Sequence, residues 1–296
     1  MDWLHMLLAE HPLGHFAIEG RHNPYLILLA YLVMCAGSFA TLDTIERIGD
    51  AELAGARRRW KLLGACCLAC SVWAMHYIGM LAFETTQEVH YDMFLTGVSL
   101  LIMLSAALGA MSILGQPLPR TRHYCLAALC VAAGVAIMHY TGMAAMRSNA
   151  QQHYNPTLVV ASVIVALIAA LLPLLMARYQ HRGNSRNPQL LKYGAALVMA
   201  AGIIATHYTG MCALTLTLPA GAPAQTALTD NSLQLSLTIA VITLLISASC
   251  ISAALSDKKL QSKEQDLRRV NTLLSQLDQA RVSLQQAAHY DALTNL

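Results

Sequence analysis

The stretch AAGVAIMHYTGMAAM, residues 132–146, decides how this chain folds, because the chain contains two further stretches that closely resemble it. The stretches LACSVWAMHYIGMLAF (68–83) and AAGIIATHYTGMCAL (200–214) align with it on the histidine without a gap. In every copy a glycine follows the histidine by three positions and a methionine by four, and a serine or glycine precedes it by five. Small residues let membrane helices approach closely, so these positions should pack the three copies against neighbouring helices.

The composition is that of a membrane protein. Of 296 residues, 56% are hydrophobic and only 12% are charged, whereas a soluble domain averages roughly 25% charged residues. Lys192 is the only Lys, Arg, Asp or Glu inside the apolar stretches that reach the length of about 20 residues needed to cross a bilayer. These stretches are 24–42, 62–83, 93–114, 124–146, 157–177, 190–214 and 233–255. We therefore predict an all-α fold, a bundle of seven transmembrane helices over residues 24–255.

Basic residues predict the orientation. All but two of the 19 Lys and Arg residues lie in connections on one side of the predicted membrane or in the C-terminal tail, and the exceptions are Arg21 and Arg147. By the positive-inside rule that side is cytoplasmic. We expect a bacterial inner-membrane protein with a periplasmic segment at 1–23, in which residues 1–16 fit a short interfacial helix, and a cytoplasmic C-terminus. Membrane lipid is the expected surrounding, and no pattern indicates nucleic-acid binding.

The repeated histidines and methionines are candidate metal ligands. Residues four positions apart lie on one face of a helix, and the three copies occupy the second, fourth and sixth spans, which run in the same direction. We place each histidine eight to twelve residues from the outer end of its span, roughly 12–18 Å along the axis. Ionisable groups at such depth are costly and usually functional. The imidazoles are therefore expected to converge, and the candidate ligands are His76, Met80, His139, Met143, His207 and Met211.

Imidazole combined with thioether predicts copper, especially Cu(I), because soft ligands select soft ions. One or two ions, as Cu(I) or Cu(II), fit the number of groups. Weaker candidates are Cys212, which follows Met211 directly, and Met75 and Met138, whose position is occupied by Thr206 in the third copy. Haem held by two facing histidines is an alternative, although three sites close together favour metal ions. Hydrogen bonds from the histidines to carbonyl groups are the structural alternative.

Beyond Leu255 the chain becomes polar and typical of a helix. Leu260, Leu267 and Leu274 recur every seven residues, and Val270, Leu277 and Leu284 follow three residues out of step. These are the a and d positions of a coiled coil, although Lys263 and Arg281 interrupt the seam. We predict a cytoplasmic coiled-coil linker at 256–288 that forms a homodimer together with the seventh span.

The repeated motif resembles that of a known family. Seven spans, an outside N-terminus and M-H-Y-T-G-M in spans two, four and six are similar to the MHYT-domain bacterial membrane sensors over roughly residues 20–255, with departures at Ile78 and Thr206. The resemblance implies a sensor that detects nitric oxide, oxygen or carbon monoxide through bound copper.

The last eight residues, HYDALTNL (289–296), resemble the H-D-x-L-T-x-L opening of a diguanylate cyclase (GGDEF) domain. The sequence is therefore expected to stop as that domain begins, and this fragment is expected not to be an enzyme. The resemblance implies that the full-length protein carries GGDEF and EAL domains that make or degrade cyclic di-GMP, as in pseudomonad regulators of alginate production or biofilm dispersal. The alternative class is a copper-handling or small-solute transporter, which would place ligands at several depths rather than one.

Overall fold

The computed structural model describes residues 15–17, 21–51, 53–85, 89–116, 119–181, 187–219 and 232–289. The chain divides into two compact units, residues 1–246 and 247–296. The first unit contains the helical bundle. The second contains the greater part of one long helix, and the two units are described separately below.

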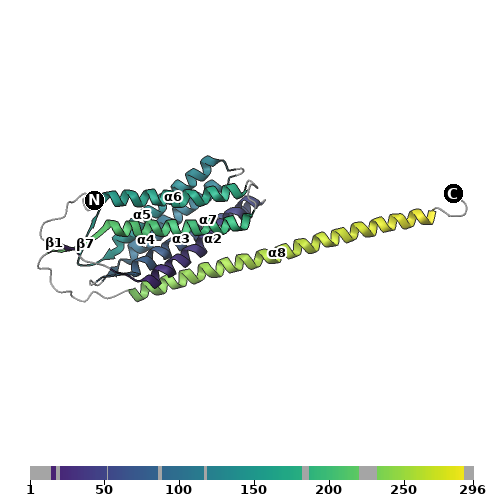
Figure 1. Ribbon diagram of the computed structural model, residues 1–296. Coiled ribbons are helices and arrows are strands. Elements are labelled where there is room, and N and C mark those ends of the chain that lie inside the picture. The colour runs from purple at the N-terminus through teal and green to yellow at the C-terminus, as the bar shows by residue number, and fades with distance from the viewer. Residues whose placement is uncertain are drawn as a thin grey trace. The chain divides into compact units, whose positions relative to one another are not determined.

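Six long helices form three antiparallel hairpins in the first unit (Figure 1). The hairpins are α2 (Pro24–Asp50) with α3 (Ala54–Leu81), α4 (Met93–Leu114) with α5 (Thr121–Ala145), and α6 (Pro156–His181) with α7 (Pro188–Ala213). Each of these helices is long and apolar enough to cross a membrane. The predicted all-α membrane bundle is therefore confirmed. The seventh span, 233–255, lies in a further helix, α8 (Ser232–His289), most of whose side chains in that range are outside the described part of the chain. The count of seven stays a prediction.

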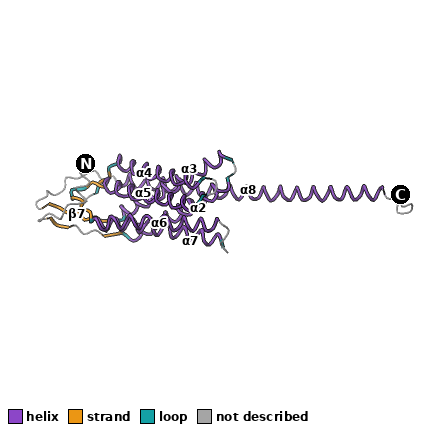
Figure 2. The backbone as a smooth tube through the Cα atoms, turned by 90° about the horizontal axis from the view of Figure 1, so that it is seen from above, coloured by secondary structure: helices purple, strands orange, loops and turns teal. Residues whose placement is uncertain are grey.

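Short antiparallel strands close every hairpin at the same end of the bundle, which we call the strand end (Figure 2). The pairs are β2 (Arg21–His22) with β3 (Phe83–Glu84), β4 (His90–Tyr91) with β5 (Met146–Arg147), and β6 (Gln151–Tyr154) with β7 (Leu214–Pro219). A further strand, β1 (His15–Ala17), pairs with the other edge of β7. The expected interfacial helix is therefore wrong at its last residues, because His15 and Phe16 add to the free edge of β7.

The same polar contacts fix the strand end of each hairpin. We call α3, α5 and α7, which carry the repeated histidines, the motif helices, and we call α2, α4 and α6 the outer helices. Each outer helix follows a capping residue, and the side chain of that residue accepts hydrogen bonds from backbone N–H groups in the first turn. The capping residues are Asn23, Asp92 and Asn155. Such caps satisfy N–H groups that have no partner within the helix. The backbone N–H groups of these residues donate to the last carbonyl groups of the partner helices, at Ala82 (2.8 Å), Ala145 (2.9 Å) and Ala213 (2.9 Å) respectively. The three hairpins are thus copies of one unit.

The hairpins assemble into a ring in which each motif helix also packs on the outer helix of the next hairpin. The junctions between hairpins are α3–α4, α5–α6 and α7–α2, and α3, α5 and α7 also contact one another. Within the hairpins, the small residue five positions before each histidine sits close to Gly37, Ala106 or Ala169 of the partner helix. The predicted packing role of the recurrent small residues is confirmed.

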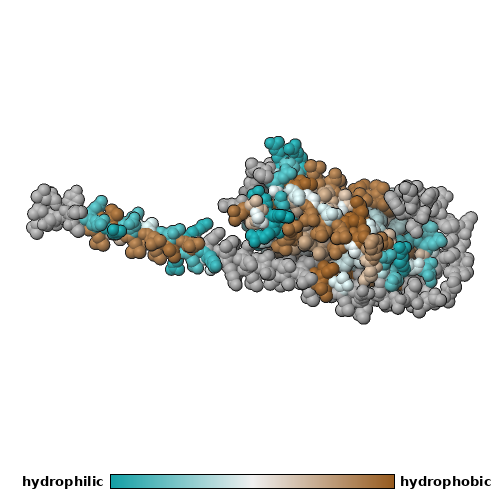
Figure 3. All heavy atoms as spheres, turned by 180° about the vertical axis from the view of Figure 1, so that it is seen from behind, coloured by the Kyte–Doolittle hydropathy of each residue, from teal (hydrophilic) through white to brown (hydrophobic). Residues whose placement is uncertain are grey.

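The outside of the bundle is apolar around its middle. Large side chains there are more than half exposed, for example Leu28 (56%), Leu101 (64%) and Val160 (58%). Figure 3 shows hydrophobic residues gathered over the middle of the helices and hydrophilic residues toward the ends. A surface of this kind suits lipid, since soluble monomers rarely expose so large an apolar area.

The second unit continues α8 through the predicted boundary at residue 255 without a break. The apolar heptad positions from Leu267 onward are exposed in the single chain, with Leu267 63%, Leu274 57% and Leu284 70% accessible. The structure therefore leaves the predicted dimer seam open, and the homodimer stays a prediction. The GGDEF-like stretch lies outside the described residues apart from His289.

Candidate metal centre

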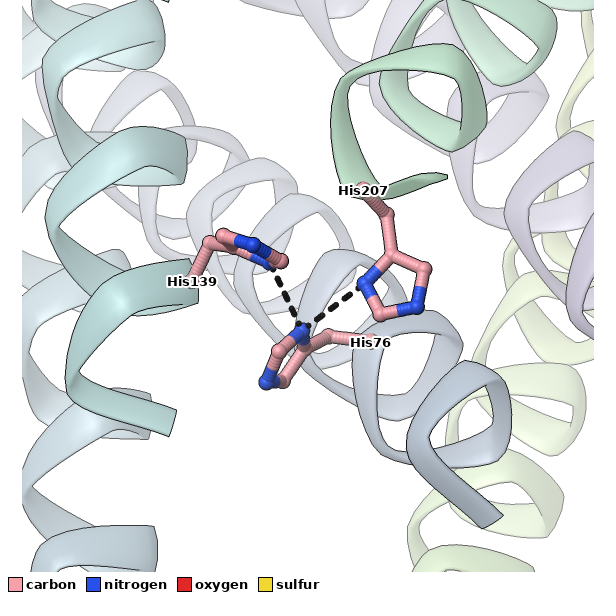
Figure 4. A group of neighbouring side chains, drawn as sticks. All are labelled: His76, His139 and His207. Carbon is pink, nitrogen blue, oxygen red and sulfur yellow. Dashed lines mark hydrogen bonds between the residues drawn. The ribbon is translucent and has the colours of Figure 1, made fainter. Parts of the chain in front are cut away.

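The three repeated histidines converge in the core of the bundle. His76 on α3, His139 on α5 and His207 on α7 are each exposed by no more than 2%. Their ring centroids lie 5.0, 5.0 and 5.2 Å apart, and the rings stand nearly perpendicular to one another. Figure 4 shows the three side chains pointing toward one another from separate helices. The predicted convergence of the imidazoles is confirmed.

The Nδ1 atoms form the centre of this cluster. Nδ1 of His76 lies 3.1 Å from Nδ1 of His207 and 3.2 Å from Nδ1 of His139. A neutral imidazole nitrogen carries either one proton or one lone pair. Three such atoms cannot all be paired with one another by protons alone, because each pair needs one donor and one acceptor. The Nδ1 atoms also lie close enough for one metal ion to use all three lone pairs at once.

The Nε2 atoms explain the glycine three positions after each histidine. A Cβ atom added at Gly142 would collide with Nε2 of His76, one at Gly210 with Nε2 of His139, and one at Gly79 with Nε2 of His207. Each imidazole is therefore seated on the glycine of the next motif helix around the ring. The Nε2 atoms of His76 and His139 are buried and have no hydrogen-bond partner among the described residues, whereas His207 has a backbone hydrogen bond at Gly79. The motif pattern predicts only a general packing role for this glycine, and its position as the seat of a histidine does not follow from the sequence.

The histidines lie nearer the strand end than expected. Their helices end only five or six residues further on, which is about 8–9 Å along the axis. The prediction of 12–18 Å is wrong, because each predicted span itself ends only seven residues after its histidine and the helix ends one or two residues before that point. All three histidines still share one depth.

The tyrosine after each histidine packs edge-on against that histidine's ring, at 4.9 Å between centroids in all three copies. The hydroxyl of Tyr77 lies 3.3 Å from Oγ of Ser99, and that of Tyr140 lies 2.8 Å from Oγ of Ser162. The hydroxyl of Tyr208 is buried and has no hydrogen-bond partner in the described part of the chain.

The candidate sulfur ligands differ in how far their side chains are exposed. Met80, Met143 and Met211 are buried, as are Met75 and Met138. Cys212 is exposed and does not share the buried surroundings of the histidines. Thr206, which replaces the first methionine of the motif, uses its hydroxyl to donate to the Gly202 carbonyl at 3.0 Å. Coordination by these sulfur atoms stays a prediction.

The single charged residue inside the predicted spans has acidic partners. Nζ of Lys192 on α7 donates to Oδ1 of Asp43 at 2.9 Å and to Oε2 of Glu46 at 2.6 Å, both on α2. Asp43 also pairs with Arg47 at 2.7 Å. Lys192 is only 6% exposed, and a buried charge of this kind is tolerated when it is paired. This cluster lies at the end of α2 opposite the strands, beyond the predicted span 24–42, so the sequence does not indicate the pairing.

Comparisons with known proteins agree with this architecture. A family model described as "Bacterial signalling protein N terminal repeat", MHYT, matches residues 70–127 and 133–187. The chain is 40% identical over 298 residues to the cyclic di-GMP phosphodiesterase NbdA of Pseudomonas aeruginosa, covering 100% of this chain and 38% of that protein. It is 33% identical to the bifunctional diguanylate cyclase/cyclic di-GMP phosphodiesterase MucR of the same organism, covering 93% of this chain and 39% of that protein.

A more distant relative is the signalling protein YkoW of Bacillus subtilis, 25% identical over 67% of this chain. The chain spans less than two fifths of the length of each of these relatives. No solved structure matches significantly. With its repeated motif, its apolar bundle and these relatives, the chain belongs to the MHYT family, the N-terminal repeat of bacterial signalling proteins, and is a multi-pass membrane domain.

Proposed function

We propose that the bundle binds one copper ion through Nδ1 of His76, His139 and His207, and that occupancy of this site regulates a cyclic di-GMP output. The separation of the Nδ1 atoms carries the proposal. A metal–nitrogen bond of about 2.0 Å requires ligand nitrogens about 3.3–3.5 Å apart in tetrahedral or trigonal geometry. The separations of 3.1 and 3.2 Å from Nδ1 of His76 to the other two Nδ1 atoms need to change by only a few tenths of an ångström.

Charge and ligand type favour copper over zinc. The three imidazoles are neutral ligands in an apolar core, and an uncompensated charge there is costly. Cu(I) brings one positive charge and Zn²⁺ brings two, so Cu(I) costs less to bury. The buried methionines four positions after the histidines are thioethers, which select Cu(I). They are available as additional ligands or as an apolar surround.

Three protein ligands leave a coordination position for a small molecule. We propose that nitric oxide, oxygen or carbon monoxide binds there. Haem is disfavoured, since the imidazole rings are in mutual contact at 5.0–5.2 Å between centroids and a porphyrin would have to lie between two of them. A transport function is disfavoured because the histidines share one depth.

The output is proposed from the relatives and from α8. NbdA and MucR carry names that state cyclic di-GMP degradation and, for MucR, synthesis. We propose that the full-length protein has one or both activities, with the C-terminus in the cytoplasm, the bundle in the bacterial inner membrane and a role in biofilm control. The exposed heptad positions of α8 (residues 232–289) suit a homodimer in which the signal passes along the helix.

Copper loading of the purified full-length protein tests the site. We expect one Cu(I) per chain by mass spectrometry, and we expect carbon monoxide to give an infrared band of a Cu(I) carbonyl. The His76→Ala, His139→Ala, His207→Ala triple variant should lose the ion. The matched control is Met138→Leu, which should keep it, since Thr206 occupies the equivalent position. Copper occupancy that is unchanged in the triple variant, or Zn²⁺ that displaces Cu(I) in direct competition, would overturn the proposal.

A further inference from the structure

The three junctions between hairpins are equivalent in geometry but are not tied in the same way. At α3–α4, Tyr77 reaches Ser99, and at α5–α6, Tyr140 reaches Ser162. Both serines stand seven residues after the capping residue of their helix. In both cases the tie lies one residue from a histidine of the cluster and joins a motif helix to the next hairpin.

The third junction, α7–α2, lacks this tie. The residue seven positions after the cap Asn23 is Ala30, which is fully buried. It has no hydroxyl, and the buried hydroxyl of Tyr208 is left without a hydrogen-bond partner among the described residues. The Tyr208 ring instead meets the His22 ring edge-on, with centroids 5.4 Å apart. A buried polar group left unpaired raises the free energy of that arrangement.

The opposite end of the same junction is firmly joined. Lys192 bonds Asp43 and Glu46 across α7 and α2. One residue further along α7, Tyr193 stacks on Phe39 of α2 with centroids 5.2 Å apart and planes 7° from parallel. The α7–α2 junction therefore has charged and stacked contacts at one end and an unpaired hydroxyl near the strand end.

We propose that α7 and α2 move apart at the strand end when a metal ion binds to the histidine cluster, while the ion pairs of Lys192 with Asp43 and Glu46 hold the other end of the junction together. This rests on the proposed metal site. Binding requires the Nδ1 atoms of His207 and His76 to separate slightly. Gly79, which seats Nε2 of His207, lies on the same helix as His76, so the His207 ring moves away from α3. The displacement passes to α7. Among the three motif helices, α7 is the one whose tyrosine does not hold it to the next hairpin.

Nitroxide pairs at equivalent positions test this movement in the full-length protein in lipid nanodiscs. The labelled pairs combine the residue five positions after each histidine with the residue two positions after the facing cap. They are Leu81 with Phe94, Ala144 with Thr157, and Cys212 with Tyr25. The nitroxide is attached to a cysteine at each labelled position, native at 212 and introduced at the others, and the remaining cysteines are replaced. Distances are measured by pulsed electron spin resonance without metal and with Cu(I), which is diamagnetic.

Without metal, we expect a broader distance distribution for the Cys212–Tyr25 pair than for the two control pairs. Ala30→Ser supplies the missing hydroxyl, and one added hydrogen bond should reduce the open population about fivefold. Ser162→Ala, which removes the hydroxyl that Tyr140 contacts, should conversely broaden the distance distribution of the Ala144–Thr157 pair. With Cu(I), the mean distance should increase for Cys212–Tyr25 alone, and Ala30→Ser should reduce that increase.

Three equal distributions without metal, or no effect of Ala30→Ser, would overturn the inference, and so would equal shifts of all pairs with Cu(I). Copper content is measured in the same samples. If Cu(I) does not bind, the proposed function fails, while the widths measured without metal still decide whether the α7–α2 junction is the loose one.

Discussion

Gly142→Ala should disable the proposed metal site by a single methyl group placed on a helix that keeps its own histidine. The added Cβ would lie well inside van der Waals distance of Nε2 of His76, while ordinary contact begins at 3.4 Å. The imidazole would therefore have to retreat by about 1 Å to reach normal contact. Metal–ligand distances tolerate changes of only about 0.2 Å. His76 should consequently be lost as a ligand.

The same substitution should affect folding far less than metal binding. Overpacking a core typically costs about 1–3 kcal/mol, whereas replacing glycine by alanine inside a helix gains about 1 kcal/mol. The net loss of unfolding free energy should be about 0–2 kcal/mol. Removal of a direct ligand should weaken copper binding by more than the roughly 10–100-fold found for indirect contacts.

Competition titration of Cu(I) against a chromophoric chelator measures the affinity, and thermal unfolding followed by circular dichroism measures stability. Gly97→Ala on α4 is the matched control, since nothing lies within 4 Å of an added Cβ there. Gly79→Ala and Gly210→Ala should behave like Gly142→Ala, through His207 and His139. The reasoning is refuted if Gly142→Ala binds Cu(I) within about threefold of the wild type, less than 1 kcal/mol, while remaining folded.

Three further predictions concern charges and the long helix. Lys192→Met should lower the unfolding free energy by about 2–3 kcal/mol, which is below the usual range for a buried pair because Glu46 is 39% exposed. Adding Asp43→Asn and Glu46→Gln should restore most of the lost stability, as measured by thermal unfolding. The N–H groups of Leu95 and Phe94, with Arg147, lower the pKa of the Asp92 carboxyl, so its stabilising effect should be complete above about pH 4 and lost as the pH falls through the lowered pKa. Asp92→Asn keeps the cap and should flatten this part of the melting temperature–pH profile, and a parallel profile would contradict the assignment. In the full-length protein, inserting two residues after Leu255 should uncouple Cu(I) or nitric oxide from cyclic di-GMP turnover, whereas a seven-residue insertion restores the heptad phase and should preserve the response; identical dose responses would exclude transmission along α8.

The membrane bundle and the meeting of the three histidines were predictable because both follow from periodicity. Apolar runs of sufficient length, and one motif carried at equal depth on three helices running the same way, leave few other arrangements. The strand ladders were not predictable, since pairs as short as Arg21–His22 with Phe83–Glu84 lack an alternating pattern. The partners of Lys192 were missed because Asp43 and Glu46 belong to a part of α2 beyond its apolar run, and only the packing of α2 on α7 brings them together.

The seating of each histidine on the glycine of another hairpin divides every motif between two neighbours. A hairpin supplies an imidazole in one direction around the ring and the seat for a different imidazole in the other. A fragment with two intact motifs would therefore contain one seated histidine, one histidine without its seat and one vacant glycine. The smallest piece of this domain that seats every histidine is the closed set of three hairpins, and a change at the glycine of one motif acts on the histidine of another.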